Sequence, residues 1–368
     1  MTVTVRSFAK INLGLRIGAP RKDGFHELLT VYQTIGLHDV IRIDMERGTG
    51  IEIRCSDPRV PKDDSNTCFR IVEMAMRALR AKGRVIVDIE KRLPVQGGLG
   101  GASANAVASL LGLERAVKKR LPTAEKLRIA AEVGSDLPLF LVGGTVLGVG
   151  RGEQVYPLED LPALACVVIT PEVGVSTPKA FAEWDRLCGI DMCGAGAPAR
   201  EGSRDTFAVS GQKQAGLYPA GQPGAAVPTR AKLIRPSAVK LTERMASDRM
   251  SELGCRLSAW LSESYSGAPF GRGRAENPLL ELVRAGIEND FEQVVFPEYP
   301  ELSNGKCALL RAGAKYASLS GSGSTLYGLF ASRAAAVRAT AQLRKQGWAA
   351  QTTATLPRRA YWRRVVGG

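Results

Sequence analysis

The sequence predicts a fold that mixes helices and strands, in a chain long enough for two domains. At 368 residues the chain can form two substantial hydrophobic cores. Segments with the alternating pattern of strands and segments with the apolar spacing of helices occur along most of its length. Two glycine-rich turns, at 97–101 and 321–323, each adjoin a strand-like segment. Glycine lets a backbone approach a ligand closely, so both turns are candidates for a functional site.

The N-terminal segments predict three strands and a turn. Residues 2–13 (TVTVRSFAKINL) alternate in polarity and predict a strand that ends in the polar cluster at 9–12. Residues 21–27 combine charged, aromatic and histidine side chains around a glycine and predict a turn. Residues 40–44 and 51–54 alternate cleanly and predict strands that a glycine turn separates.

Helical and strand-like segments then follow one another up to residue 170. Ser65 or Asn66 is a candidate N-cap for a helix that ends near Gly83. The other elements expected here are a strand at 85–90, a helix that reaches about residue 113, a helix from 123 to about 134 and a strand at 163–170.

The composition changes between about residues 188 and 248, where glycine, alanine, proline and serine replace the periodic pattern. A structureless stretch of this length inside a compact domain is unusual, so we expect a flexible insertion here. After it, strand-like segments at 314–317 and 326–330 enclose the second glycine-rich turn. The helices expected in this half lie at 250–261, 278–285, 307–312 and 331–346.

Composition argues against several classes of protein. Hydrophobic residues make up 45% and charged residues 23% of the chain, as in soluble globular proteins. No apolar run is long enough to span a membrane, and the first residues lack the pattern of a secretory signal. Seven scattered cysteines do not form a disulfide framework, so we expect a reduced, cytoplasmic protein. Two histidines and no C-x-x-C pair argue against zinc, and we expect Mg²⁺ held largely by substrate phosphates.

The net charge of +14 is unevenly distributed. From residue 331 to the end there are eight basic residues and no acidic ones. This bias favours anionic ligands and loose nucleic-acid binding, although a solvated basic surface explains each residue separately. A basic nucleic-acid-binding protein, with Tyr361 and Trp362 in its arginine-rich tail, is therefore one alternative, but no recognised RNA-binding motif is present.

The stretch Leu93–Leu111 carries the clearest chemical signal. Four glycines, at 97, 98, 100 and 101, follow a strand-like run and precede a helical pattern. This order presents backbone N–H groups and the positive end of a helix dipole to one point, which favours phosphate binding. The loop lacks the G-K-[ST] ending of a P-loop and the last glycine of G-x-G-x-x-G. A tight turn without a ligand remains the alternative for this stretch alone.

Three motifs in order are more specific than any one of them. They are K-x-N at 10–12, P-x-x-G-G-L-G-G-x-S at 94–103 and Ser-Gly-Ser-Gly at 320–323, and together they resemble the motifs of the GHMP kinases. The resemblance implies a fold of two α+β domains. One is an ATP-binding domain at 1–160 that is similar to domain 2 of ribosomal protein S5. The other is a ferredoxin-like domain at 161–368.

Further motifs narrow the resemblance to the 4-diphosphocytidyl-2-C-methyl-D-erythritol kinase family. The sequences D-G-F-H-E-L at 23–28, G-S-D-L-P at 134–138 and G-R-G-E at 150–153 carry it. The similarity covers about residues 5–182 and 276–331. It implies that ATP, with Mg²⁺, phosphorylates the 2-hydroxyl of the substrate, a step in the non-mevalonate route to isoprenoid precursors. The implied partners are this small molecule and ATP, for a monomer or homodimer without a membrane partner.

The resemblance also implies roles for individual residues. Asp136 matches the general base, and Lys10 matches the lysine that orients the hydroxyl and stabilises developing charge. Asn12, Phe25, His26 and Phe181 match substrate-binding positions, with the two phenylalanines beside the cytosine. The implied ATP-binding residues are Asn66, Lys91, Pro94, Gly98, Leu99, Gly100, Gly101, Ala102, Ser103 and Ala104. The residues expected to support the cleft are Gly321, Ser322 and Gly323.

The chain departs from the family pattern in the first glycine-rich loop. Ala102 stands where the family has a third consecutive glycine, and Ala104 stands where it has a second serine. The first change removes backbone freedom and the second removes a hydroxyl, so both would weaken nucleotide binding. A GHMP kinase that acts on another small alcohol remains the alternative within the class. A Ser/His hydrolase is not expected, because no G-x-S-x-G motif is present.

Overall fold

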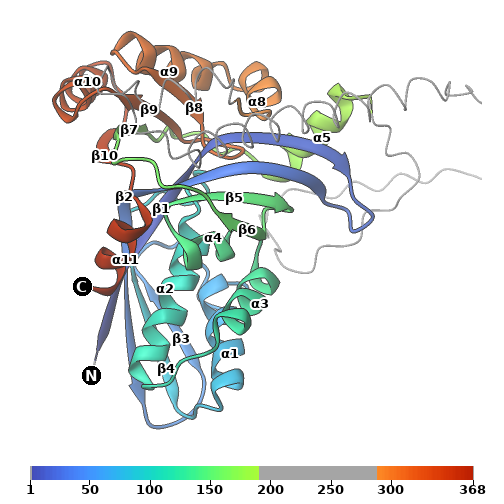
Figure 1. The fold of residues 1–368 in the computed structure, drawn as a ribbon, viewed down its shortest axis with the longest axis vertical. Helices are drawn as coiled ribbons and strands as arrows, with labels where there is room; N and C mark the ends of the chain where they lie inside the picture. The colour runs from blue at the N-terminus through green and yellow to red at the C-terminus, as the bar shows by residue number, and fades with distance from the viewer. Residues whose placement is uncertain (1, 190–287, 368) are drawn as a thin grey trace, which may run out of the picture.

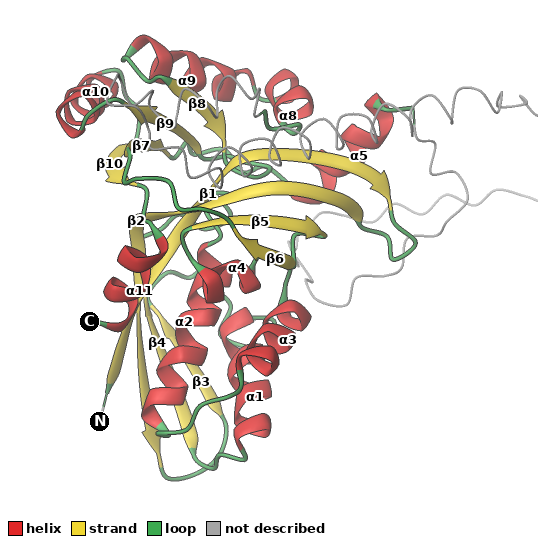
Figure 2. Ribbon diagram, viewed as in Figure 1, coloured by secondary structure: helices red, strands yellow, loops and turns green. Residues whose placement is uncertain are grey.

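The computed structural model describes residues 2–189 and 288–367. In these ranges the chain forms a six-stranded sheet and a four-stranded sheet, and helices pack against both (Figures 1 and 2). The insertion expected at 188–248 lies almost entirely outside the described residues, and the helices expected at 250–261 and 278–285 lie wholly outside them. No helix in the described ranges is both long and apolar enough to cross a lipid bilayer.

Two long strands organise the first sheet. β1 (Val3–Pro20) and β2 (His26–Glu46) pair antiparallel along almost their whole length. One half of β2 also pairs with β4 and the other half with β5, which gives the order β3-β4-β2-β5-β6 with β1 beside β2. The remaining strands are β3 (Ile51–Cys55), β4 (Arg84–Glu90), β5 (Thr145–Gly150) and β6 (Gln154–Pro157).

The prediction that the first strand ends at residues 9–12 was wrong. β1 continues through this polar cluster to Pro20, with register shifts on either side of it. The side chains of Lys10 and Asn12 point into the protein rather than to solvent, with relative exposures of 3% and 1%. Polar residues that signalled a strand end are therefore buried in the middle of a strand, which is the first structural indication of a site.

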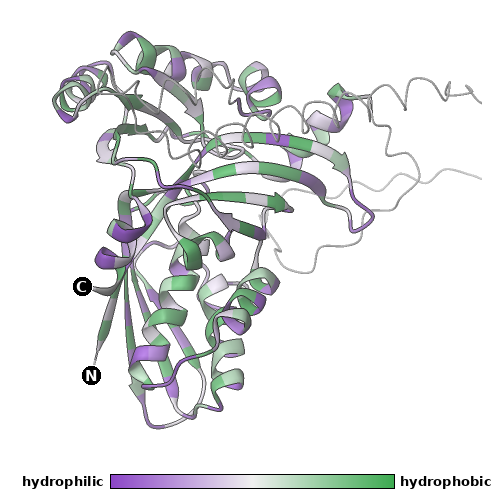
Figure 3. Cartoon of the chain, viewed as in Figure 1, coloured by the Kyte–Doolittle hydropathy of each residue, from purple (hydrophilic) through white to green (hydrophobic). Residues whose placement is uncertain are grey.

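Four helices of the first half are described, and Figure 2 shows them on one side of the first sheet. They are α1 (Thr67–Leu79), α2 (Gly101–Ala116), α3 (Thr123–Val133) and α4 (Leu137–Val142). Asn66, one of the two predicted candidates, is the N-cap of α1, and that helix ends at Leu79, a turn earlier than expected. α2 is apolar along most of its length (Figure 3) and is buried from Ala104 to Glu114. Its burial fixes the helix whose N-terminus follows the first glycine-rich loop.

The second sheet is antiparallel, in the order β10-β7-β9-β8. Its strands are β7 (Ala165–Ile169), β8 (Tyr316–Leu319), β9 (Leu326–Phe330) and β10 (Ala350–Ala354). The helices beside it are α5 (Thr177–Leu187), α8 (Glu292–Glu298), α9 (Pro300–Arg311) and α10 (Arg333–Lys345). The strands expected around the second glycine-rich turn are confirmed as β8 and β9, and the helix expected at 307–312 begins earlier, at Pro300.

Contacts between the two halves are extensive. Leu15 and Ile17 of β1 belong to the core of the second sheet, and a further apolar cluster joins β1 and β2 to strands of the second sheet. The last helix, α11 (Arg358–Val366), returns to the first half, where Tyr361 and Val365 are buried in its core. Both ends of the described chain therefore lie on the same side of the molecule (Figure 1).

Candidate active site

Four polar side chains meet where β1 and β2 pass the start of α4. Lys10 and Asn12 lie on β1, Tyr32 lies on β2, and Asp136 immediately precedes α4. Lys10 Nζ donates a hydrogen bond to Asn12 Oδ1 over 2.6 Å and lies 3.6 Å from Asp136 Oδ2. The Tyr32 hydroxyl donates to the other carboxylate oxygen, Oδ1, over 3.0 Å. Each oxygen of Asp136 therefore faces a different partner.

The burial of these groups sets their charge states. Burial lowers the pKa of Lys10 below its ordinary value, and the nearby carboxylate of Asp136 offsets part of that shift. Burial and the Asp136 charge both raise the pKa of Tyr32, so its hydroxyl stays protonated and acts as a donor. Lys10 is buried, whereas 32% of the Asp136 side chain is exposed. A ligand can therefore reach the carboxylate, while the ammonium group is held behind it.

The two glycine-rich turns meet beside Lys10. Ser320 Oγ donates to the carbonyl oxygen of Gly98 over 2.9 Å, and the amide of Lys10 donates to the carbonyl oxygen of Leu99 over 3.0 Å. Gly98 has a φ of +75°, and a Cβ there would lie 2.1 Å from the Ser320 carbonyl oxygen. Gly100 has a φ of +66°, and a Cβ there would lie 3.0 Å from Lys10 Cγ. Both positions therefore require glycine, for conformation and for space.

The second turn, Gly321–Gly323, is held in place by neighbouring side chains. Asn289 Nδ2 donates to the carbonyl oxygens of Leu319 and Gly321, over 2.9 and 2.8 Å. The hydroxyl groups of Ser322 and Thr177 lie 2.7 Å apart. Asn289 is buried. Its role was not predicted, because no motif marks the residues that follow the long irregular segment.

The first glycine-rich loop leads into α2 with an exposed first turn. Gly100 is the N-cap of α2, and no side chain in the described ranges caps that end of the helix. Gly101 and Ala104 are buried, Ser103 is half-buried and Ala102 is exposed. Uncapped N–H groups at a helix N-terminus favour an anionic ligand. Strand, loop and helix thus occur in the order that the sequence predicted.

Asp39 organises the segment that precedes this loop. Its fully buried carboxylate accepts hydrogen bonds from Lys91 Nζ over 2.6 Å, from the amides of Arg92 and Leu93 over 2.6 and 2.7 Å, and from Asn105 Nδ2 over 2.9 Å. These bonds connect β2 to the loop entrance and to α2. Sequence reasoning missed Asp39, because only the fold brings its partners together.

The remaining predicted ATP-binding residues lie around the same loop but have structural contacts of their own. Lys91 Nζ would lie 3.3 Å from a Cβ at Gly101, so its ammonium group faces the loop. Pro94 packs beneath Gly97 in the turn. Asn66 Oδ1 accepts from the amide of Cys68 over 2.8 Å and so caps α1. Asn66 Nδ2 donates to the carbonyl oxygen of Pro61 over 2.6 Å.

The predicted substrate-base residues lie at the far end of β1 and β2, beside α5 (Figure 1). The rings of His26 and Phe181 are stacked, with centroids 4.9 Å apart and planes 10° from parallel. His26 Nε2 lies 2.7 Å from Asp185 Oδ1, four residues after Phe181 on α5. Phe25 lies instead beside Arg151, whose guanidinium carbon is 4.9 Å from the ring centroid. The fold thus groups His26 with Phe181 and places Phe25 toward the loop that carries Arg151.

The basic C-terminal helix α11 supports the helix that follows Asp136. The Tyr361 hydroxyl donates to the carbonyl oxygen of Phe140 over 2.7 Å, and Trp362 Nε1 donates to that of Val142 over 3.0 Å. Arg358 Nε donates to the carbonyl oxygen of Gly143 over 3.1 Å. These groups satisfy carbonyl oxygens at the C-terminal end of α4. Tyr361 and Trp362 therefore have intramolecular roles in holding α4.

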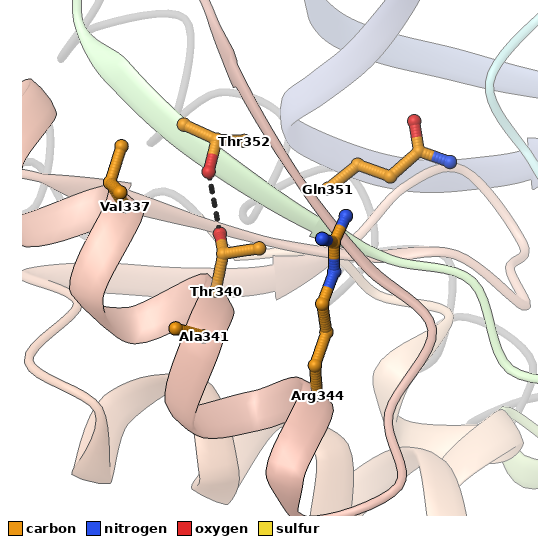
Figure 4. A pocket seen from close by; sticks show the side chains of 6 residues that line it. All are labelled: Val337, Thr340, Ala341, Arg344, Gln351 and Thr352. Atoms are coloured by element: carbon orange, nitrogen blue, oxygen red, sulfur yellow. Dashed lines mark hydrogen bonds between the residues drawn. The ribbon is translucent and has the colours of Figure 1, made fainter.

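The cavity drawn in Figure 4 lies apart from this group of residues. It has a volume of about 500 Å³ and lies between α10 and β10, where the hydroxyl groups of Thr340 and Thr352 are 2.7 Å apart. None of its lining residues is a predicted site residue. The charged groups and glycine turns around Lys10 are the better candidate for chemistry.

The fold and the site together define a small-molecule kinase of the GHMP class. The model of the GHMP kinases N terminal domain matches residues 66–144, and the GHMP kinases C terminal model matches residues 275–348. A 4-diphosphocytidyl-2-C-methyl-D-erythritol kinase of Solibacter usitatus is 33% identical, over 98% of this chain and 92% of that protein. The enzyme of the same name from Acaryochloris marina is 31% identical, over 92% of this chain and 91% of that protein. The chain belongs to the 4-diphosphocytidyl-2-C-methyl-D-erythritol kinase family.

Solved structures agree on the fold. A crystal structure of a 4-(cytidine 5'-diphospho)-2C-methyl-D-erythritol kinase has a TM-score of 0.63 and 23% identity, with 96% of this chain and 98% of that chain covered. A homoserine kinase from Cytophaga hutchinsonii has a TM-score of 0.61 and 18% identity, with 97% of this chain and 95% of that chain covered. The two-domain GHMP kinase fold expected from the sequence is confirmed.

Proposed function

We propose that this protein transfers the γ-phosphoryl group of ATP to the 2-hydroxyl of 4-diphosphocytidyl-2-C-methyl-D-erythritol. The observation that carries the proposal is the Lys10–Asp136 pair, placed where both glycine-rich turns meet. Curated relatives that align over more than nine tenths of the chain bear the name of this kinase. We place the nucleotide in residues 1–160, and the substrate between that part and residues 161–368.

In the proposed mechanism Asp136 is the general base. Its side chain is 32% exposed, and Oδ2 accepts the proton of the 2-hydroxyl while Tyr32 holds Oδ1. The substrate oxygen forms a bond to the γ-phosphorus, and the bond between that phosphorus and the β–γ bridging oxygen breaks to release ADP. Lys10 supplies positive charge beside the reacting hydroxyl and the transferred group. Asn12 holds the Lys10 ammonium group in place through its 2.6 Å hydrogen bond.

The ATP phosphates are placed on Gly98–Ala104, where N–H groups of the loop and of α2 stabilise negative charge. Lys91, oriented by Asp39, faces the same loop, and Asn66 with Pro94 borders it. Mg²⁺, bound with ATP, would supply charge neutralisation at the phosphates. The Ser103 hydroxyl, in the first turn of α2, is a hard oxygen donor of the kind Mg²⁺ accepts. The ATP phosphates would provide the other ligands.

The cytosine is placed beside Phe25, His26 and Phe181. Aromatic rings on the far ends of β2 and on α5 offer flat apolar surfaces, and the imidazole offers a hydrogen bond to the edge of the base. Asp185 fixes the orientation of the His26 ring through the 2.7 Å contact. We also propose a cytoplasmic protein, as a monomer or homodimer, with no partner beyond these small molecules.

The test is ADP release from Mg-ATP with the cytidine substrate, homoserine and R-mevalonate compared side by side. Phosphorus-31 NMR of the product should show a new phosphomonoester with the cytidine substrate and none with homoserine or R-mevalonate. Turnover with homoserine or R-mevalonate, and none with the cytidine substrate, would assign the protein to another alcohol within the same class.

A further inference from the structure

Arg151 lies in a sharp turn next to the reaction centre. It occupies the loop between β5 and β6, flanked by Gly150 with a φ of +71° and Gly152 with a φ of +97°. A Cβ at Gly152 would lie 2.4 Å from the Tyr32 hydroxyl and 4.0 Å from Asp136 Oδ1. Consecutive Cα atoms are about 3.8 Å apart. Arg151 therefore directly precedes, in the chain, the glycine whose backbone approaches the proposed general base.

The side chain of Arg151 extends the other way, to the proposed base pocket. Its guanidinium carbon lies 4.9 Å from the centroid of the Phe25 ring. Glu153 fixes the turn, because its Oε2 accepts from the Arg151 amide over 2.6 Å. The same carboxylate stays 3.6 Å from Arg151 Nε, and the guanidinium makes no hydrogen bond within the described residues. The Arg151 side chain is 29% exposed, so a ligand can reach it.

Two other cations near Phe25 and Asp136 are already engaged. Arg21 contacts both Asp23 and Glu27, at 3.2 and 2.7 Å. Lys10 is buried and donates to Asn12. Of these three cations, Arg151 alone combines a partly exposed side chain with a charged group that is free of hydrogen bonds within the described ranges, and its one ion pair, to Glu153, is long at 3.6 Å.

We propose that Arg151 binds the diphosphate of the substrate. The inference rests on the proposed function, which places a cytosine at Phe25 and the reacting hydroxyl at Asp136. In such a substrate the diphosphate connects the cytidine to the alcohol, so its charge must cross the interval that Arg151 spans. A guanidinium presents paired N–H donors that match phosphate oxygens, and it can stack on an aromatic ring at the same time. Arg151 thus binds the diphosphate, the part of the substrate that a simple alcohol lacks.

The test compares competitive inhibition by CDP and by cytidine in the wild type and in Arg151→Gln. Both compounds carry the base, but only CDP carries the diphosphate. A lost charge-assisted hydrogen bond should weaken CDP and raise the KM of the cytidine substrate about ten- to hundredfold. Cytidine inhibition and the KM for ATP should stay unchanged. Arg151→Lys should retain part of the discrimination, because it keeps the charge without the fork.

The matched control is Arg128→Gln on α3, an exposed arginine paired with Glu125 and Glu132. It should leave both inhibition constants unchanged. Equal weakening of CDP and cytidine in Arg151→Gln would mean that Arg151 only positions the Phe25 ring, and an unchanged CDP constant would mean that it does not contact the diphosphate. Either result overturns the inference. If the wild type does not phosphorylate the cytidine substrate, the proposed function fails instead.

Discussion

Replacing Gly152 with alanine should disturb catalysis through a single atom. A Cβ at this position would lie 2.4 Å from the Tyr32 hydroxyl, a distance that real Cβ atoms essentially never show. The two atoms must separate by at least about 0.6 Å to reach the 3.0 Å at which such contacts begin. The Tyr32 hydroxyl is also the donor to Asp136 Oδ1. Gly152→Ala should therefore displace the proposed general base together with its partner.

The expected loss in kcat is about 10- to 100-fold, since a displacement near 1 Å in a catalytic group costs about that much. Gly313→Ala is the matched control. Gly313 also has a φ of +97°, but a Cβ there would meet no atom within 4 Å. Both substitutions carry a backbone strain of about 1–3 kcal/mol. Only Gly152→Ala should reduce kcat in the coupled ADP-release assay, at saturating ATP and cytidine substrate.

A double-mutant cycle isolates the contact. Tyr32→Phe removes the clashing oxygen, and the next atom of the ring, Cζ, would lie at an ordinary 3.6 Å. Alone, it loses a hydrogen bond to a carboxylate that is one-third exposed, which is about 1 kcal/mol or fivefold in kcat. Gly152→Ala/Tyr32→Phe should be about as active as Tyr32→Phe. Additive losses in the double variant would refute the steric reasoning.

Four further predictions concern other contacts of the protein. Asp39→Asn should lower the free energy of unfolding by about 3 kcal/mol and raise the KM for ATP, because Lys91 loses its buried partner. Urea unfolding measures the first effect and initial rates measure the second. Unchanged values would contradict the role of Asp39. Tyr361→Phe should cost about 1–2 kcal/mol in urea unfolding by leaving the Phe140 carbonyl oxygen without its donor, and an unchanged midpoint would contradict the capping role of α11. Activity should fall as pH rises through the lowered pKa of Lys10, because the mechanism needs the charged amine. Lys10→Met should be inactive yet unfold at a higher urea concentration than wild type at neutral pH, and this difference should shrink as pH rises toward the unfolded-state value of 10.5.

The sequence predicted the segments of the site better than their contacts. Local signals narrowed the N-cap of α1 to Ser65 or Asn66 and placed the first glycine-rich loop between a strand and a helix, because capping and glycine conformation act over a few residues. The end of the first strand was misjudged, since burial of Lys10 depends on β2, α4 and the second turn together. Polar residues in a strand indicate an end or a site, and sequence alone does not separate the two.

Two residues of the site, Tyr32 and Asp39, could not be predicted from the sequence, because their partners are distant along the chain. Tyr32 meets Asp136 across 104 positions, and Asp39 meets Lys91 across 52, so no local spacing marks either pair. The helix α11 did carry a usable signal, because Tyr361 and Val365 are four residues apart and bury one face. The arginines around them drew attention to charge instead of to this face.

The most direct test of the account is single-turnover phosphoryl transfer to the cytidine substrate by Asp136→Asn. Asp88→Asn on β4, where the carboxylate is about half exposed, is the matched control. We expect Asp136→Asn to bind ATP as the wild type does and to transfer phosphate about 100- to 10,000-fold more slowly, while Asp88→Asn stays fully active. A folded Asp136→Asn protein that retains more than about a tenth of the wild-type rate would contradict the assignment of the general base.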